Sequence, residues 1–496
     1  MRIGAALLVA GVGWMVASAL AGGTRPESLP GSDRPVNRGA RDPGDLRARN
    51  SPTVTRSPRE RERLAISSRV DSPDFSCAVH TSGDGGISWS PVAVPVPRGY
   101  GPKCYAPDAT FGADGVLHVS YVTLTGRANQ PEAVWVASSK DGGRTLSEPR
   151  RVSGPLAFQV RIAADPDRPD RLFATWLQAR DIGSLKFTAP GNPIVVSRSD
   201  DGGATWSRPV RANDPNRGRA LAPSAAVGRQ GELYVLYLDV GGDRLDYEGA
   251  HENVGGPPYA GRFSLVLARS LDRGRTWAES VVDDRVVPTE RFIPFLPPFP
   301  SLAVDHRSGR IYVGFHDARL GTPDVWVWTL PWRGKAWNRP VRVNDTAQRD
   351  RTAQYLPALS VAPDGRLDVV YYDRRADRRS NVRNQVSLQS SQDDGRSFGA
   401  RTELSSRSSD SRIGFGSERG LATLGSRLGL TSGDDELLAV WSDTRVGTRA
   451  SNKQDLVRAV VGMDSRGRMQ VLRYGGLALA VLGSGMIAVA LRRRSV

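Results

Sequence analysis

The chain has 496 residues, with 68 lysines and arginines against 52 aspartates and glutamates, which gives a formal net charge of +16. Only five of the basic residues are lysine, and such an arginine excess attracts anionic partners such as acidic sugars, envelope polymers or lipid head groups. There is no basic–aromatic RNA-binding motif, no Gly-rich phosphate loop and no Gly–x–Ser–x–Gly elbow. The five histidines lack metal-ligand spacing. We therefore expect no nucleic-acid partner, no metal and no cofactor.

The first 50 residues contain no folded domain by composition. Residues 1–21, MRIGAALLVAGVGWMVASALA, have a basic start, an apolar run and an Ala–Leu–Ala ending, which is the pattern of a secretory signal peptide. Residues 22–50 are rich in Pro, Gly, Arg and Asp with almost no apolar content. This composition predicts a disordered spacer.

A segment of the form Pro–x–apolar–Ala–x–x–x–Gly–x–apolar–x–Val then recurs along the chain. Clear copies begin at residues 107, 223, 300 and 357, and a looser copy occupies residues 160–177. Each copy contains two apolar runs of strand length separated by turn residues. Each therefore predicts two antiparallel strands joined by a tight turn.

About thirty residues after each copy lies a second pattern, Ser–x–Asp–x–Gly–x–Ser/Thr–aromatic. It reads SGDGGISW at 82–89, SDDGGATW at 199–206, SLDRGRTW at 270–277 and SQDDGRSF at 391–398, while SKDGGRTL at 139–146 ends in Leu. The glycine supplies the positive φ of a tight reversal, and the carboxylate accepts hydrogen bonds from its own turn. We predict a structural role in hairpin turns for the five aspartates, Asp84, Asp141, Asp201, Asp272 and Asp393.

Together the two patterns define a repeated unit of four antiparallel strands. The units lie at about 51–97, 104–153, 160–213, 222–283, 299–343, 356–404 and 420–472. Repeated units of this period without helical segments predict an all-β chain with a single β-propeller over residues 51–472. We predict seven blades, with six as the alternative if the weak first unit merely completes the last blade.

The two cysteines are expected on one face of this propeller. In a four-stranded blade, the loops after strands two and four lie on the face opposite the repeated turns. Cys77 starts the third strand of the first unit and Cys104 enters the second unit. Outside the cytoplasm this placement predicts a Cys77–Cys104 disulfide, with two buried thiols as the alternative.

The same face carries the candidate ligand-binding residues. The second strands end in Asp–x–Arg pairs, and an arginine ring around the central channel suits a carboxylate ligand. The alternative is that each pair closes its own loop. Links into the innermost strands add Tyr105, Arg161, Tyr355 and Glu418. The candidate ligand-binding residues are Arg69, Arg319, Arg375, Arg445, Asp317, Asp373 and Asp443.

Residues 474–491, YGGLALAVLGSGMIAVAL, are uncharged and are followed by RRRSV at 492–496. Eighteen helical residues span about 27 Å, enough for a hydrocarbon core. This pattern predicts one transmembrane helix with a cytoplasmic basic tail. We therefore expect a cell-membrane protein whose propeller lies on the extracytoplasmic side.

With these repeats the chain resembles the Asp-box, or BNR-repeat, propellers, a superfamily that includes the bacterial sialidases, across roughly residues 50–472. The resemblance implies an exo-α-sialidase type of glycoside hydrolase. By loop position, Tyr355 with Glu418 would form the nucleophile pair and Asp71 would be the acid. The arginines would hold the sugar carboxylate. The family's Arg–Ile–Pro signature is missing from the first blade, where SSRVDSP at 67–73 offers Arg69 and a displaced Pro73.

Two functions follow from the sequence. The first is a surface protein that recognises acidic glycans, as a hydrolase or as a binder. The second is a non-catalytic propeller that scaffolds protein partners at the cell envelope. They differ in whether the predicted arginines point jointly at the channel mouth.

Overall fold

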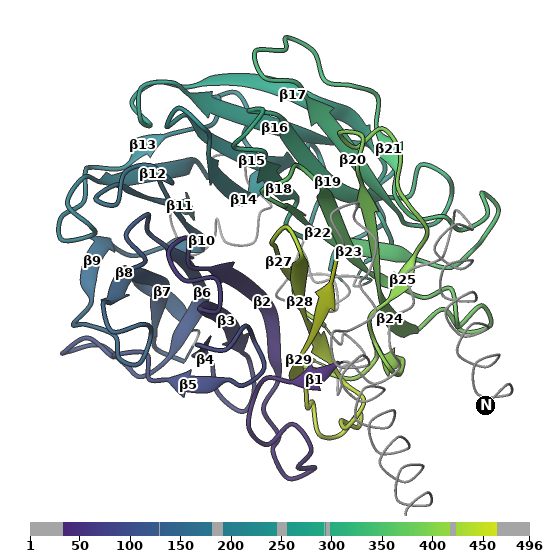
Figure 1. The fold of residues 1–496 in the computed structure, drawn as a ribbon, viewed down its shortest axis with the longest axis horizontal. Helices are drawn as coiled ribbons and strands as arrows, with labels where there is room; N and C mark the ends of the chain where they lie inside the picture. Colours follow the sequence, from purple (N-terminus) through teal and green to yellow (C-terminus); the bar gives the residue numbers. More distant parts are fainter. Residues whose placement is uncertain are drawn as a thin grey trace, which may run out of the picture.

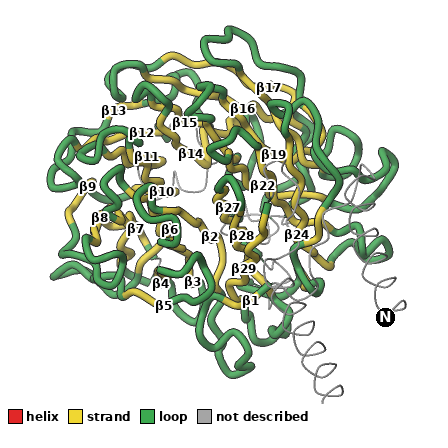
Figure 2. The backbone as a smooth tube through the Cα atoms, viewed as in Figure 1, coloured by secondary structure: helices red, strands yellow, loops and turns green. Residues whose placement is uncertain are grey.

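The computed structural model describes residues 33–127, 129–180, 192–245, 255–291, 293, 298–416 and 423–463. Within these ranges all regular secondary structure is β-strand (Figure 2). The strands form seven antiparallel sheets arranged in a ring about a central axis (Figure 1). The predicted all-β propeller with seven four-stranded blades is confirmed.

In blades 1 to 6 the first four strands follow one another outward from the axis in chain order. Blade 1 comprises β2 (Arg49–Arg56), β3 (Leu64–Val70), β4 (Ser76–Ser82) and β5 (Ser90–Val92). Blade 2 comprises β6 (Cys104–Phe111), β7 (Leu117–Thr125), β8 (Gln130–Ser139) and β9 (Arg150–Ser153). Blade 3 comprises β10 (Ala157–Ala164), β11 (Leu172–Gln178), β12 (Ile194–Ser199) and β13 (Val210–Arg211). Blade 4 comprises β14 (Ala220–Val227), β15 (Leu233–Asp239), β16 (Phe263–Ser270) and β17 (Ala278–Val286). Blade 5 comprises β18 (Ser301–Val304), β19 (Ile311–Asp317), β20 (Asp324–Leu330) and β21 (Val341–Arg342). Blade 6 comprises β22 (Gln354–Val361), β23 (Leu367–Asp373), β24 (Arg383–Ser391), β25 (Thr402–Glu403) and a short fifth strand, β26 (Ser409–Asp410).

The core lies between the blades. Successive side chains of a strand point to opposite faces, so a strand that is apolar throughout must be covered on both sides. Strand β15 has the sequence LYVLYLD, and its first six residues are buried. One apolar cluster joins Phe173 of blade 3, Leu236 of blade 4 and Trp328 of blade 5. Each blade is therefore packed between its two neighbours.

Blade 7 is completed by a strand from the beginning of the described chain. Its inner strands are β27 (Gly429–Ser432), β28 (Glu436–Asp443) and β29 (Asp455–Gly462). The fourth is β1 (Arg34–Pro35), which pairs with β29 through Arg34 and Arg458. The spacer predicted over residues 22–50 is therefore wrong from Asp33 onward, and blade 1 keeps four strands of its own. The low apolar content of this segment led us to predict disorder, but the segment is held largely by polar contacts, which apolar content does not reveal.

A buried polar cluster holds this segment in place. The Lys453 ammonium is fully buried and donates to the Gly39 carbonyl at 2.9 Å and to Asp455 Oδ1 at 3.1 Å. Asn37 Nδ2 also donates to Asp455 Oδ1, at 3.0 Å. Arg49, at the start of β2, donates to Asp45 Oδ2 at 3.1 Å. These contacts join blade 7, blade 1 and the segment between them, so they close the ring.

The repeated turns share one hydrogen-bond pattern. In the turn at 199–206, Asp201 Oδ1 accepts from Ser199 Oγ at 2.7 Å and from the Thr205 amide at 2.9 Å. Asp201 Oδ2 accepts from the Thr205 hydroxyl at 2.5 Å. The other four predicted aspartates make the corresponding bonds. Each carboxylate is thus engaged within its own turn, on the end of the blades that we name the turn face.

The opposite end of the blades, which we name the loop face, carries the links between blades. There the predicted Cys77–Cys104 disulfide is present, with a Cα–Cα distance of 5.6 Å. It joins β4 of blade 1 to β6 of blade 2. The cross-link therefore fixes two neighbouring blades at the face where the candidate ligand-binding residues were expected.

The predicted signal segment (1–21), membrane segment (474–491) and basic tail (492–496) lie outside the described residues. A search of the part of the chain that the structure describes finds no helix with the length and apolar character needed to cross a membrane. The anchoring of the protein therefore stays a prediction from sequence.

Three buried histidines make the fold sensitive to acid. Burial lowers the pKa of His80 and of His118 to about 4 and that of His316 to about 3. The unfolded chain binds these protons near the ordinary histidine pKa, so acidification below about pH 6.5 favours unfolding. We expect the free energy of unfolding to fall between pH 7 and pH 5 by about 2 kcal/mol for each histidine. Urea unfolding followed by tryptophan fluorescence measures this change.

His118→Gln is the control for that measurement, because the glutamine keeps a polar partner for Ser138 but does not titrate. This variant should lose about 2 kcal/mol less than the native protein over the same pH interval. An identical pH dependence in both proteins would contradict the assignment of the effect to buried neutral histidines.

The closure of the ring gives a second prediction. Lys453→Met removes the buried cation but keeps most of the side-chain volume, and it leaves Asp455 without its nearest positive charge. We expect a loss of about 3 kcal/mol in the free energy of unfolding. Lys140→Met, at an exposed position, should leave it unchanged within about 0.5 kcal/mol. Equal urea midpoints for the two variants would show that the Lys453 cluster does not hold the ring.

Candidate functional site

A backbone irregularity recurs where the inner strands start at the loop face. In blades 1, 2, 3, 4 and 6 the pairing of the first two strands shifts register. At each shift lies a non-glycine residue in the left-handed region, namely Ser51, Ala106, Gln159, Ala222 and Leu356, with φ of 50–56°. Such residues are strained and concentrate at functional sites.

Blade 7 has Gly425 at the corresponding place, with φ of 93°. In four of the other blades a proline follows the left-handed residue. Proline lacks an amide hydrogen and is tolerated at bulges of edge strands. Four residues within two positions of these left-handed residues, Tyr105, Asp108, Arg161 and Arg427, form part of the site.

The first part of the site comes from blades 1 and 2. Arg69, at the end of β3, donates to both carboxylate oxygens of Asp71, with its Nε 3.1 Å from Oδ1. Its guanidinium carbon lies 4.5 Å from the centroid of the Tyr105 ring. Asn50 Nδ2 donates to Asp71 Oδ2 at 2.8 Å. Burial disfavours the Arg69 cation, but Asp71 outweighs burial and raises the pKa of Arg69.

The second part comes from blades 3, 5 and 7, which meet at Phe299. The guanidinium carbons of Arg161 and Arg427 lie 5.9 and 5.6 Å from the centroid of the Phe299 ring. The Phe299 amide donates to the Ser426 carbonyl at 3.1 Å, which ties the entry of blade 5 to blade 7. We name the side chains that meet here the axial cluster, comprising Arg69, Asp71, Tyr105, Asp108, Arg161, Phe299 and Arg427.

The three arginines of the axial cluster differ in their partners. Arg69 is paired with Asp71, and Arg161 Nη1 lies 3.2 Å from Asp108 Oδ1. Arg427 is 8% exposed and donates from Nη2 to the Pro107 carbonyl at 2.9 Å. Among the described residues no carboxylate lies within 4 Å of it and its Nε has no hydrogen-bond partner. The cluster therefore holds a buried cation that has no ion-pair partner within the part of the chain that the structure describes.

The electrostatics of Arg427 follow from that arrangement. Burial, then the neighbouring Arg161 and Arg69 cations, lower the pKa of Arg427. An anion bound beside it would reverse this effect, because it would supply the missing opposite charge. Within the described ranges there is no group of three or more His, Cys, Asp or Glu side chains placed to hold a metal ion. The guanidinium groups of the axial cluster are suited to bind an anion.

Of the four predicted ligand arginines, the structure places only Arg69 in the axial cluster. Each of the others is bound by the aspartate two residues before it and by a second aspartate. Arg319 contacts Asp317 at 2.6 Å and Asp283 at 2.9 Å. Arg375 and Arg445 follow the same pattern, with Asp373 and Asp345 and with Asp443 and Asp33. These three arginines therefore form separate ion-pair groups, each of which ties a loop to a neighbouring segment.

The predicted nucleophile pair is not assembled in the axial cluster. Tyr355 is fully buried. Its hydroxyl donates to Asn384 Oδ1 at 3.0 Å and accepts from Arg374 Nη2 at 3.2 Å. Glu418 lies outside the described residues. Of the predicted catalytic residues only Asp71 belongs to the axial cluster, and the tyrosine found there is Tyr105, the residue that precedes the left-handed Ala106 as Tyr355 precedes Leu356.

Arg427, Asp108 and Phe299 were missed as site residues by sequence reasoning, although a signal for two of them exists. Asp108, Arg161 and Arg427 each lie two residues after the left-handed residue of their blade. An alignment of the repeats with Pro107 of blade 2 as the reference would place these three residues at the same position, directly after the proline. Phe299 carries no such signal, because its contacts come from a link between blades.

The chain matches no family model. It is 29% identical to the sialidase of Micromonospora viridifaciens over 323 residues, which cover 60% of this chain and 45% of that protein. The chain thus spans less than half the length of this relative. The architecture defines a seven-bladed β-propeller, and part of the chain is similar in sequence to a sialidase.

Solved structures with a similar fold are more distant. A protein of unknown function from Dyadobacter fermentans is 14% identical, with a TM-score of 0.47 over 87% of this chain and 98% of that one. The endosialidase of phage phi92 is 9% identical, with a TM-score of 0.47 over 88% of this chain and 69% of that one. At such values these comparisons carry no argument about activity.

Proposed function

We propose that the protein is a sialidase-like surface propeller that recognises acidic glycans at the axial cluster. The carboxylate of a sugar would bind Arg427, with Arg69 and Arg161 beside it. The observation that carries the proposal is the buried Arg427 cation, which has no carboxylate partner among the described residues. The similarity to a sialidase over 323 residues supports the same ligand class.

The remaining members of the cluster suit a sugar. The Phe299 ring lies near the guanidinium groups of Arg161 and Arg427 and is 7% exposed, so pyranose C–H groups would pack against the part of the ring that stays accessible. Asp71 and Asp108 provide carboxylate acceptors for hydroxyl groups. Guanidinium groups bind a carboxylate through paired N–H donors, which fixes its orientation as well as its charge.

Turnover is a separate part of the proposal. In the hydrolase form, of exo-α-sialidase type, Asp71 is the acid and a tyrosine is the nucleophile, with Glu418 as its predicted partner. Tyr105 is the tyrosine within the cluster, but burial raises its pKa. A neutral phenol is a poor nucleophile without an adjacent base. We therefore propose recognition as the primary function and hydrolysis as an addition to it.

The second candidate is a propeller that scaffolds protein partners at the cell envelope. The observation that favours it concerns Arg319, Arg375 and Arg445, each of which is bound by an aspartate of its own loop and by a second aspartate from another segment. A ligand site that used all the predicted arginines would have left these groups available. Protein partners would then contact the loop face without a sugar at the axis.

We also propose that the protein is anchored with its loop face away from the membrane. The described chain leaves blade 7 at Met463, whose amide donates to the carbonyl of Asp435 in a turn of the turn face at 2.7 Å. Ten residues separate Met463 from the predicted span that begins at residue 474. Ten extended residues reach at most about 36 Å, so the turn face would lie near the bilayer.

The proposal predicts the affinity for a simple acidic sugar. Full-length protein in a maltoside detergent should bind α-methyl sialoside, and Arg427→Met should weaken this binding by about 10- to 100-fold, the effect of one charge-assisted contact. Calorimetry or ligand-observed NMR measures the affinity. Arg144→Met, on the turn face, is the matched control and should bind as the native protein does.

Methyl galactoside, which lacks the carboxylate, should not bind measurably. Hydrolysis is tested with a fluorogenic α-sialoside. If the native protein releases the fluorophore and Tyr105→Phe or Tyr355→Phe does not, the protein hydrolyses sialosides as well as binding them. Absence of sialoside binding by the folded native protein, or equal affinity in Arg427→Met, would refute recognition at the axial cluster and favour the scaffold.

A further inference from the structure

Three loops of the loop face lie side by side at blade 6. They are the link at 346–353, the segment at 374–383 that joins β23 to β24 and includes the first residue of β24, and the segment at 405–413 toward blade 7, which includes β26. The Ala353 amide donates to Asn381 Oδ1 at 2.9 Å, which joins the first loop to the second. The Ser411 amide donates to the Val382 carbonyl at 2.9 Å, which joins the second to the third. The three loops therefore form one continuous surface.

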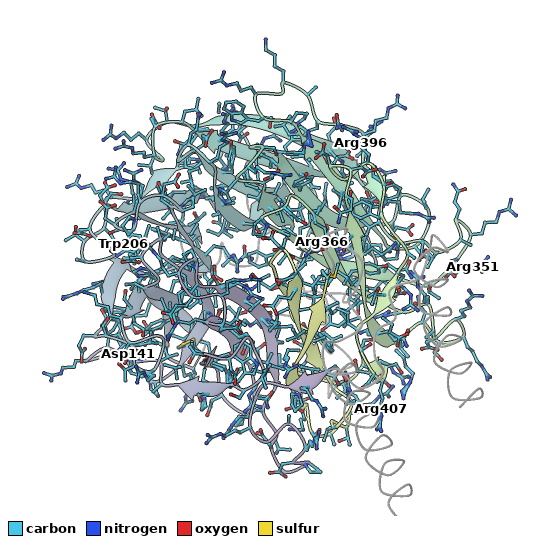
Figure 3. All side chains as sticks on the ribbon, in the orientation of Figure 1. Asp141, Trp206, Arg351, Arg366, Arg396 and Arg407 are labelled. Carbon is cyan, nitrogen blue, oxygen red and sulfur yellow. A yellow bond between two sulfur atoms is a disulfide. The ribbon has the colours of Figure 1, made fainter. Side chains whose placement is uncertain are left out.

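This surface is strongly basic. The loops contain two, five and two arginines, nine in total, against one aspartate each, three in total. We name the exposed arginines that lack a close acidic partner, together with Arg378, the arginine surface. It comprises Arg349, Arg351, Arg378, Arg379, Arg383 and Arg407. Arg351 and Arg407 lie at the edge of the ring on the side of blades 6 and 7 (Figure 3).

The three aspartates neutralise only a small part of this charge. Asp410 is bound by Arg412 at 2.6 Å, outside the arginine surface. Asp377 Oδ2 accepts the amides of Val382 and Arg383, both at 3.0 Å, so it serves the backbone of its loop. Asp350 lies 3.6 Å from Arg378, which is its partner within the surface. Among the described residues no carboxylate lies within 4 Å of the other five arginines.

The loops are held from beneath by a buried arginine. Arg374 is 6% exposed and donates to the Asn381 carbonyl at 2.7 Å and to Ser411 Oγ at 2.9 Å. The same guanidinium donates to the Tyr355 hydroxyl at 3.2 Å, in the wall of the inner strand β22. The exposed cations are therefore displayed on loops that are fixed to the propeller, which lowers the entropic cost of binding a partner.

We propose that the arginine surface binds a linear acidic polysaccharide, with carboxylate or sulfate groups along its chain. Cations spread over three loops match a polymer better than a single small ion. None of the three loops contains an aromatic residue, and binding of single-stranded nucleic acid relies on aromatic stacking. This second site goes beyond the axial cluster, and only its ligand class, an acidic glycan, rests on the proposed function.

The test uses full-length protein in maltoside detergent with a fluorescent heparin oligosaccharide as the probe. The triple variant R349S/R351S/R379S removes three exposed charges that have no acidic partner among the described residues. We expect its affinity at low salt to be at least about tenfold weaker, with a smaller dependence of affinity on salt concentration. The matched control, R144S/R208S/R275S, removes three exposed charges from the turn face and should change affinity less than about twofold.

Two further probes test which kind of polymer binds the arginine surface, and one further variant separates this surface from the axial cluster. Neutral dextran should not bind, and single-stranded DNA of equal charge should bind more weakly than heparin. Three results would each overturn the proposal. They are an equal loss of heparin affinity in both triple variants, no heparin binding by the native protein, and tighter binding of DNA than of heparin through the same arginines. The variant R427M should keep heparin affinity, so a failure of sialoside binding with intact heparin binding would refute only the axial site.

Discussion

The axial cluster depends on the closure of the ring between blades 7 and 1. Arg427 belongs to the last blade and Arg69 to the first, so the two cations share a site only when these blades pack against each other, as β2 does against β27 and β28. An apolar cluster that includes Ile66 of blade 1 and Leu438 of blade 7 joins the two blades. Buried polar contacts around Lys453 add to this closure and hold the segment that carries β1.

The arginines of the loop face fall into three groups with different consequences. Arg319, Arg375 and Arg445 are bound by two aspartates each and shape the loops that carry them. Arg427 is buried with a carbonyl as its acceptor, which leaves a charge for a ligand to neutralise. The arginine surface at blade 6 is exposed, so its charges act over a wider area and are screened by salt. Position and partners, more than the number of arginines, decide the function.

The repeats in the sequence were sufficient to predict the blades, their number, the turns at Asp84 to Asp393 and the Cys77–Cys104 disulfide, because each depends on local spacing. The strand β1 was missed, since its contacts are made with residues more than 400 positions away. The site was predicted only in part. Alternation along a strand breaks at a bulge, so the side chains beside Ala106 and Gln159 could not be placed from pattern alone.

The central claim is that a sugar carboxylate binds Arg427, for which the described residues provide no carboxylate within 4 Å. The most direct measurement is a crystal structure of the protein with α-methyl sialoside bound. The account predicts a carboxylate oxygen within about 3 Å of an Arg427 nitrogen, with the sugar ring against Phe299. A sugar bound elsewhere on the loop face, or bound with its carboxylate turned away from Arg427, would contradict it.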